Sequence, residues 1–306
     1  MHRRLSDASD GFQDQVIKPE ERAMLLQDPI RPVTQAEVET FWQDGVVLLR
    51  GILDTHWLDA LSGPLEQTIS LGEAVNLGTM SPDSDLASAS ESSPAAPAFS
   101  AGTDHWRHDE TFLAFATASP LAPIAATLLN SDHIWLWEDS VLVKEAGSPF
   151  VTKFHTDASY FNLEGDQVCT MWIPLDAATP SSGVVSWVRG SHRDPVEYRP
   201  NMFVTDEPIP GTLGEIVPDV LDTPELAARL ISFDLEPGDL TVHHARTLHG
   251  SPANTSEVRR RAVSMRYFGD DARYRRKPGL MVRPAMTSLS DGDTLGPPDC
   301  PLAWPR

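Results

Sequence analysis

The alternation of apolar and polar positions predicts helices near the start of the chain, after a polar arm at residues 1–33. Thr34 and Glu37 have the spacing of a capping box, in which each side chain bonds the other residue's backbone N–H. The apolar positions that follow share one helical face, and Gly45 is placed to end the helix. A second helix is expected from Asp54, with an apolar face made by Trp57, Leu58 and Leu61.

The rest of the chain has the pattern of a β protein. Val46–Leu49 reads as a buried strand, and from Ile134 onward short apolar runs alternate with turn residues, interrupted by one helix near 224–230. Helices first and strands afterwards favour a mainly β fold with flanking helices. We therefore predict a double-stranded β-helix (jelly roll, cupin-like) core braced by N-terminal helices.

Two segments break this pattern. Residues 78–103 are rich in Ser, Pro and Asp, and a loop of this length inside a compact domain predicts a flexible lid. Residues 271–306 contain six prolines and predict an extended C-terminal tail. The main domain is accordingly expected at residues 34–270.

Composition narrows the classes of function. The 306 residues suffice for one large β domain, and a formal charge of −20 argues against binding nucleic acid or an anionic membrane surface. No uninterrupted apolar run reaches the roughly 18 residues of a membrane span, and the first residues lack the apolar core of a signal peptide. Two cysteines without a CxxC spacing indicate neither a disulfide framework nor a zinc knuckle. The expectation is a cytoplasmic enzyme, monomeric or homodimeric, with a small-molecule substrate.

The candidate chemistry begins with His155-Thr156-Asp157. Residues two apart in a strand point to the same side, so His155 and Asp157 can bind one metal ion without distorting the backbone. Two imidazoles and one carboxylate on one face of a metal are the ligands of a mononuclear non-haem Fe(II) centre. On these residues alone, the pair could equally be a hydrogen-bonded pair at a strand edge. The second histidine could be His243, His244 or His249, of which His243 and His244 are adjacent, so that only one of them can face a cavity.

Arg260 is a second candidate. It lies at the start of a strand-like run at residues 262–268, and its planar guanidinium is suited to pairing with a carboxylate through two hydrogen bonds. Its neighbours Arg259 and Arg261 point to the other side of a strand, so the register selects Arg260. The alternative is that Arg260 is a surface cation within a triple-arginine run.

Several blocks in a fixed order resemble the phytanoyl-CoA dioxygenase family of Fe(II)/2-oxoglutarate oxygenases, over roughly residues 34–270. The blocks that carry the resemblance are residues 142–149, 154–160, 170–179, 189–193, 237–240, 244–254 and 259–264. The resemblance implies a metal site formed by His155, Asp157 and His249, because the block places His244 five residues before the ligand. It also implies that Arg260 binds the far carboxylate of 2-oxoglutarate. Further candidates for the cosubstrate pocket are Ser251, Ser140 and Trp172. Ser251 could instead cap the turn, Trp172 could be a core residue, and Lys144 is expected to be exposed.

The activity implied by the resemblance is hydroxylation of an unactivated C–H bond with Fe(II), 2-oxoglutarate and O2, releasing succinate and CO2. Halogenating relatives have a small residue in place of the carboxylate, so Asp157 favours hydroxylation. The alternatives are a non-oxidative cupin-type metalloenzyme and a catalytically silent binding module on the same fold. The substrate is not predicted, although the segments 78–103 and 160–166 are expected to select it.

Overall fold

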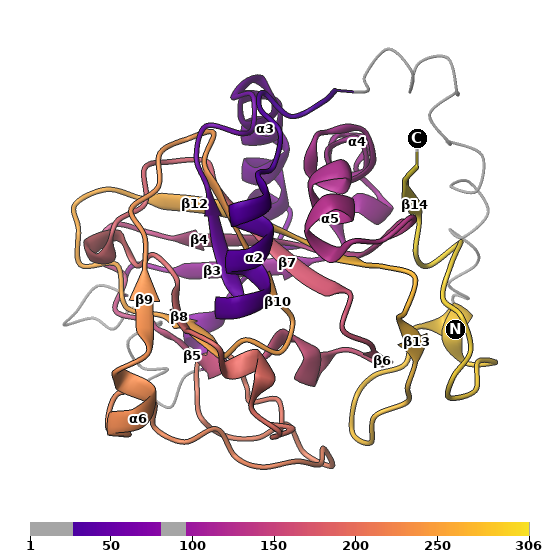
Figure 1. The fold of residues 1–306 in the computed structure, drawn as a ribbon. Coiled ribbons are helices and arrows are strands. Elements are labelled where there is room, and N and C mark those ends of the chain that lie inside the picture. The colour runs from indigo at the N-terminus through magenta and orange to yellow at the C-terminus, as the bar shows by residue number, and fades with distance from the viewer. Residues whose placement is uncertain (1–26, 81–95, 306) are drawn as a thin grey trace, which may run out of the picture.

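The computed structural model describes residues 27–80 and 96–305 and has two facing β-sheets with helices over one of them (Figure 1). The larger sheet has eight strands in the order β1-β10-β7-β12-β4-β3-β2, with β14 beside β4. All of its neighbouring strands are antiparallel. Its strands are β1 Val46–Leu49, β2 Val75–Asn76, β3 Phe99–Thr103, β4 Ile134–Lys144, β7 Val168–Pro174, β10 Leu240–His244, β12 Arg260–Phe268 and β14 Leu302–Trp304.

The smaller sheet carries the candidate metal ligands. Its order is β5-β11-β8-β9, and a separate pair is formed by β13 and β6. These strands are β5 Thr152–His155, β6 Leu163–Glu164, β8 Ser186–Val188, β9 Leu230–Ser232, β11 His249–Ser251 and β13 Arg273–Tyr274. Two antiparallel sheets that enclose a cavity agree with the predicted jelly-roll core.

Four of the five α-helices within the described residues lie together over the larger sheet (Figure 1). The α-helices are α2 Gln35–Asp44, α3 His56–Ser70, α4 Glu110–Ala118, α5 Leu121–Leu129 and α6 Pro224–Ala227. Short 3-10 helices are η1 Leu77–Met80, η3 His105–Arg107, η4 Asp157–Tyr160, η5 Pro180–Ser182, η6 Ser191–Arg193 and η7 Pro284–Met286. The main hydrophobic core lies between this helical layer and the sheet. The sequence pattern did not predict α4 and α5, which pack there beside α2 and α3.

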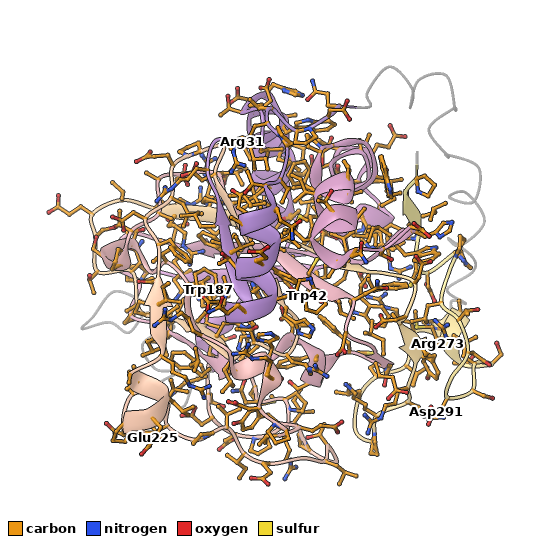
Figure 2. All side chains as sticks on the ribbon, in the orientation of Figure 1. Arg31, Trp42, Trp187, Glu225, Arg273 and Asp291 are labelled. Carbon is orange, nitrogen blue, oxygen red and sulfur yellow. The ribbon has the colours of Figure 1, made fainter. Side chains whose placement is uncertain are left out.

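The predicted start of the domain is confirmed in detail. Thr34 and Glu37 form the capping box of α2, and Gly45 ends the helix with a left-handed backbone at φ 76°. Only glycine adopts this conformation without steric cost. The next residues form β1 over the predicted range, and Trp57 is buried on α3 beside Leu58 and Leu61. Side chains fill the space between these layers (Figure 2), and the Trp42 indole N–H of α2 donates to the Leu128 carbonyl of α5 at 2.9 Å.

The two predicted irregular segments differ from expectation where the structure describes them. Of the segment 78–103, residues 99–103 form β3, which pairs with β4 as part of the larger sheet, and residues 81–95 lie outside the described residues. Residues 271–305 are mostly irregular, but β14 pairs with β4, and Met286, Leu295 and Cys300 are buried in a core cluster with Trp137. The C-terminal segment is therefore packed against the domain. Of the predicted N-terminal arm, only residues 27–33 are described.

No single helix within the described ranges has the length and apolar composition needed to cross a membrane. The helices α4 and α5 would meet both conditions only when taken as one, and a bend of 41° separates them.

Candidate metal centre

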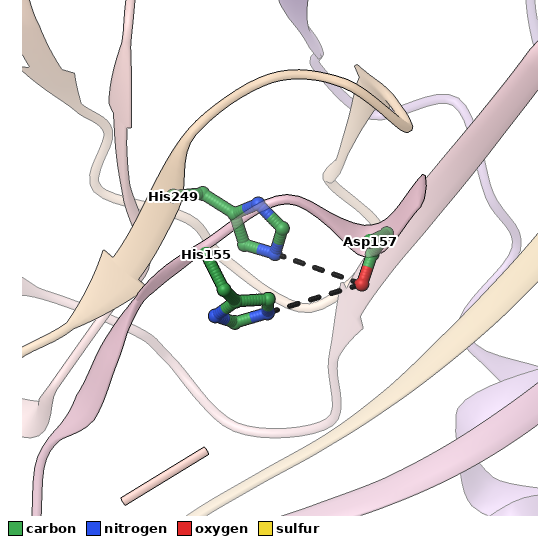
Figure 3. A group of neighbouring side chains, drawn as sticks. All are labelled: His155, Asp157 and His249. Carbon is green, nitrogen blue, oxygen red and sulfur yellow. Dashed lines mark ion pairs between the residues drawn. The ribbon is translucent and has the colours of Figure 1, made fainter. Parts of the chain in front are cut away.

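His155, Asp157 and His249 converge from two paired strands and the turn that follows one of them (Figure 3). His155 ends β5, Asp157 begins η4, and His249 begins β11 directly opposite His155. The Nε2 atom of each imidazole lies 3.9 Å from Asp157 Oδ1, and all three side chains are buried. The three donor atoms lie within 4.8 Å of one another, which makes the group a candidate metal site.

The backbone fixes the orientation of both imidazoles. His155 Nδ1 donates to the carbonyl of Lys153 at 2.7 Å, and His249 Nδ1 donates to the carbonyl of Thr247 at 2.9 Å. Each bond requires a proton on Nδ1 and leaves the Nε2 lone pair directed toward Asp157. Burial lowers the pKa of His155 to about 3 and that of His249 to about 4. Both rings are therefore neutral near pH 7, which is the form that binds a metal.

Three side chains hold the carboxylate of Asp157. Its Oδ2 atom accepts hydrogen bonds from Thr170 Oγ1 at 2.5 Å and from His243 Nε2 at 3.1 Å. Arg266 Nη2 lies 3.5 Å from Oδ1. Burial by itself raises the pKa of Asp157, but the Arg266 guanidinium and the hydrogen bond from His243 outweigh it and hold the pKa well below its usual value. The carboxylate is thus ionised, with Oδ1 presented between the two imidazoles.

The three histidines of the distal region, His243, His244 and His249, take different places. His243 and His244 face opposite sides of β10, as the strand period requires. His243 lines the cavity and bonds Asp157, whereas His244 packs beside Trp42 behind the sheet. Within the described residues, only His155, Asp157 and His249 form a group that could hold a metal ion.

Arg260 faces the same cavity from the start of β12. It is 2% exposed and has no hydrogen bond or ion pair with any described residue, and its guanidinium carbon lies 5.4 Å from the centre of the Trp172 ring. Burial lowers its pKa to about 10, so it remains charged near pH 7. Arg259 and Arg261 point away, as the register predicted, and pair with acidic residues outside the cavity. Arg260 is therefore a buried cation without a counterion in the described protein.

The remaining predicted pocket residues have different surroundings. Ser251 and Trp172 line the cavity, and the Ser251 hydroxyl donates to Thr152 Oγ1 at 3.1 Å. Ser140 does not line it, and its hydroxyl accepts a hydrogen bond from Arg266. The expectation for Lys144 was wrong. It is fully buried, because β4 lies inside the larger sheet, and its Nζ donates to Ser251 Oγ at 2.7 Å.

Sequence reasoning missed the side chains that support Asp157. Thr170, His243 and Arg266 stand side by side on β7, β10 and β12, where Thr170 is in register with both of the others. The alternation of strand residues holds a usable signal, since Arg260 and Arg266 are separated by an even number of positions on one strand. Which residues of neighbouring strands stand beside them depends on strand order, which the sequence pattern does not contain.

Comparisons with known proteins agree with this arrangement. The profile of the phytanoyl-CoA dioxygenase (PhyH) family matches residues 41–262. A probable alpha-ketoglutarate-dependent hypophosphite dioxygenase of Stutzerimonas stutzeri is 31% identical over 127 residues, which are 42% of this chain and 42% of that protein. A probable phytanoyl-CoA dioxygenase of Caenorhabditis elegans is 30% identical over 118 residues, which are 38% of this chain and 36% of that protein. The alignments thus span about two fifths of the length of these relatives.

Solved structures share the fold at low identity. The carbocyclase SnoK from nogalamycin biosynthesis superposes with a TM-score of 0.67 at 22% identity, covering 89% of this chain and 96% of that one. The epimerase SnoN in complex with Fe3+, alpha-ketoglutarate and nogalamycin RO gives a TM-score of 0.66 at 23% identity, covering 88% and 98%. The jelly-roll fold is therefore confirmed. Because the family profile covers most of the chain, from α2 to β12, this protein belongs to the phytanoyl-CoA dioxygenase family.

Proposed function

We propose that this protein is an Fe(II)- and 2-oxoglutarate-dependent dioxygenase that hydroxylates an unactivated C–H bond of a small molecule and releases succinate and CO2. The observation that carries the proposal is one cavity with two kinds of group. It contains two neutral imidazoles beside an ionised carboxylate, and also a buried arginine without a counterion. The first group suits a ferrous ion, and the second suits a carboxylate.

His155, Asp157 and His249 would hold the iron, which when bound with 2-oxoglutarate supplies the oxidising chemistry with O2. The protein itself orients the three ligands. The Lys153 and Thr247 carbonyls fix the two imidazole planes. Thr170 and His243 occupy the Oδ2 atom of Asp157, so the carboxylate would bind the metal through Oδ1. A ligand of this kind leaves coordination positions for the cosubstrate and O2.

Arg260 would bind the far carboxylate of 2-oxoglutarate. A dianion in this cavity gives the buried guanidinium the partner that the described residues do not provide. Trp172 would form a wall beside it, and the Ser251 hydroxyl would turn from Thr152 to donate to the same carboxylate. Ser140 acts, in this proposal, only through its contact with Arg266.

The alternative is a non-oxidative metalloenzyme on the same fold, in which Arg260 would bind an anionic substrate in place of a cosubstrate. Consumption of 2-oxoglutarate separates the two functions. The cytoplasmic location and the monomeric or dimeric state remain predictions.

The test is anaerobic reconstitution of the full chain with Fe(II) and 2-oxoglutarate, read by the visible absorption of their chelate. Exposure to O2 with a panel of small molecules should then release succinate above the uncoupled background. Arg261→Met is the matched control for Arg260→Met, since it removes the neighbouring charge that faces away from the cavity. A protein that takes up Fe(II) but gives no chelate absorption with 2-oxoglutarate would rule out the proposed function.

A further inference from the structure

A second and larger cavity lies on the other side of η4 from the metal centre. Its volume is about 570 Å³, within the range of small-molecule sites. Thr156, Ala158 and Ser159 line it, whereas Asp157, between them in sequence, lines the metal cavity. None of the three candidate metal ligands borders it. The turn that carries Asp157 is thus the wall between two cavities.

The position of this second cavity follows from the strand register. Val168 and Ala245 line it, and they lie two residues along the chain from Thr170 and His243, which line the metal cavity. Two residues of strand correspond to roughly 6.6 Å. Ala158 N–H donates to the Ala245 carbonyl at 2.8 Å, which fixes η4 at this end of the sheet. The second cavity therefore lies next to the metal cavity, one row of side chains further along the strands.

Most acidic side chains of the cavity are already paired. Arg275 lies 2.9 Å from Glu197 and 3.5 Å from Glu164. Arg246 lies 2.8 Å from Asp166. These pairs place two cations against three carboxylates, and the fourth carboxylate of the lining, Asp271, accepts hydrogen bonds from the backbone N–H groups of Asp166 and Gln167.

Three further cations of the cavity have no carboxylate partner in the described part of the chain. Arg273, on β13 at the edge of the molecule (Figure 2), donates to the backbone carbonyls of Asp270 and Ala272. Lys277 Nζ donates to the Ala158 carbonyl at 2.6 Å, and the side chain of Arg276 has no bond to any described residue. Three unpaired cations in one cavity of a chain with a net charge of −20 form a local site for an anion.

The cavity also has an apolar side. Leu163, Val196, Leu213 and Leu280 line it together with Val168. An inorganic anion would leave this surface in contact with water, whereas a ligand with a short carbon chain would cover it. The combination of cations and apolar side chains fits a small organic acid.

We infer that this cavity is a binding site for a small organic anion, whose carboxylate or phosphate is held by Lys277 and Arg276 and whose carbon chain lies on the leucine side. Lys277 also bonds Ala158, the residue next to Asp157, so the anion would bind beside the turn that orients the metal ligand. Binding of the anion does not depend on iron. Only the case in which the anion is the substrate rests on the proposed oxygenase function.

Hexanoate is a suitable probe, with hexanamide as its neutral match. Titration calorimetry on the full chain, with Mn(II) and saturating 2-oxoglutarate under nitrogen to fill the Arg260 subsite, should show hexanoate binding at least tenfold tighter than hexanamide. Lys277→Met should lose at least tenfold in hexanoate affinity, and Lys277→Arg should retain it. Arg276→Met removes an exposed side chain without structural contacts and should also weaken binding severalfold.

Arg189→Met is the charge-matched control, because Arg189 is exposed and lies outside the cavity lining. Its hexanoate affinity should equal that of the unaltered protein. Equal binding of hexanoate and hexanamide, or unchanged hexanoate affinity in both Lys277→Met and Arg276→Met, would overturn the inference.

Turnover with Fe(II) and O2 then shows whether the bound anion is a substrate or an effector. Oxidised hexanoate formed together with succinate assigns the cavity to the substrate. A change in succinate release with hexanoate recovered intact assigns it to an effector that acts through η4. If the chelate absorption of Fe(II) and 2-oxoglutarate fails while hexanoate binding persists, the proposed function is wrong and the anion site stands.

Discussion

Replacement of Arg260 by methionine should stabilise the protein without ligand and weaken its binding of 2-oxoglutarate. Arg260 is buried, stands in register with the buried Lys144, and has no counterion in the described protein. A buried charge without a partner costs free energy, and a second cation nearby adds to the cost. The pKa of Lys144 is well below its usual value, through burial first and Arg260 second. The unpaired charge of Arg260 therefore destabilises the folded protein until an anion binds.

The magnitude follows from the lowered pKa. Burial shifts the pKa of Arg260 from 12.5 to about 10, and at about 1.4 kcal/mol per unit this corresponds to roughly 3 kcal/mol. For a base, a lowered folded-state pKa means that the unfolded chain holds the proton more tightly. The charged arginine therefore lowers stability at every pH below about 10. After the lost packing is subtracted, Arg260→Met should raise the free energy of unfolding by about 1–2 kcal/mol, while 2-oxoglutarate affinity falls by roughly 2–4 kcal/mol.

Urea unfolding of the metal-free protein measures the first effect, and calorimetric titration of 2-oxoglutarate into the Mn(II)-loaded protein measures the second. Arg261→Met is the control on the same strand. Arg261 lies 2.7 Å from Asp176, which together with its hydrogen bonds raises the pKa of Arg261. Its loss should lower stability by up to about 1 kcal/mol, because the pair is partly exposed, and should leave 2-oxoglutarate affinity unchanged.

The two variants should therefore move stability in opposite directions. If Arg260→Met lowers the free energy of unfolding as Arg261→Met does, Arg260 has a partner and the reasoning from its burial is wrong. Unchanged 2-oxoglutarate affinity in Arg260→Met would separately remove its assigned role.

Three further predictions concern the metal centre and the second cavity. Asp157→Ala should abolish coupled hydroxylation and reduce Fe(II) uptake, measured by metal analysis after desalting; full iron content would contradict its role as a ligand. Thr170→Val keeps the shape of the side chain but removes the hydrogen bond to Asp157 Oδ2, and should weaken Fe(II) binding by about 10- to 100-fold in a competition titration, against little change in thermal stability. Burial, followed by Arg275, lowers the pKa of Lys277 to about 8, so hexanoate affinity should be full below pH 8 and fall by up to about tenfold per pH unit above it. Lys277→Arg should remove this pH dependence up to pH 10; the same dependence in both proteins would place the titrating group elsewhere.

The sequence predicted those features that depend on a few neighbouring residues. The capping box at Thr34, the left-handed Gly45 and the β1 strand are encoded by local spacing, and each is found where it was expected. The side of β12 on which the Arg260 side chain lies was also predicted, because side chains alternate between the two faces of a strand. The helices α4 and α5 were missed because they are apolar on nearly every side. A helix buried all round has no polar face, so it lacks the periodicity by which an amphipathic helix is recognised.

Features that depend on strand order were not predictable from a single sequence. Lys144 reads as an exposed strand end, but β4 lies between β12 and β3 and is covered on both sides. The same holds for the support of Asp157, since Thr170, His243 and Arg266 reach one carboxylate from β7, β10 and β12. A His-x-Asp tripeptide on any strand offers the same ligand types. This one is a candidate iron site because Thr170 and His243 occupy one oxygen of Asp157 and leave the other between two imidazoles. The residues that distinguish it from a chance tripeptide are therefore ones that only the fold brings together.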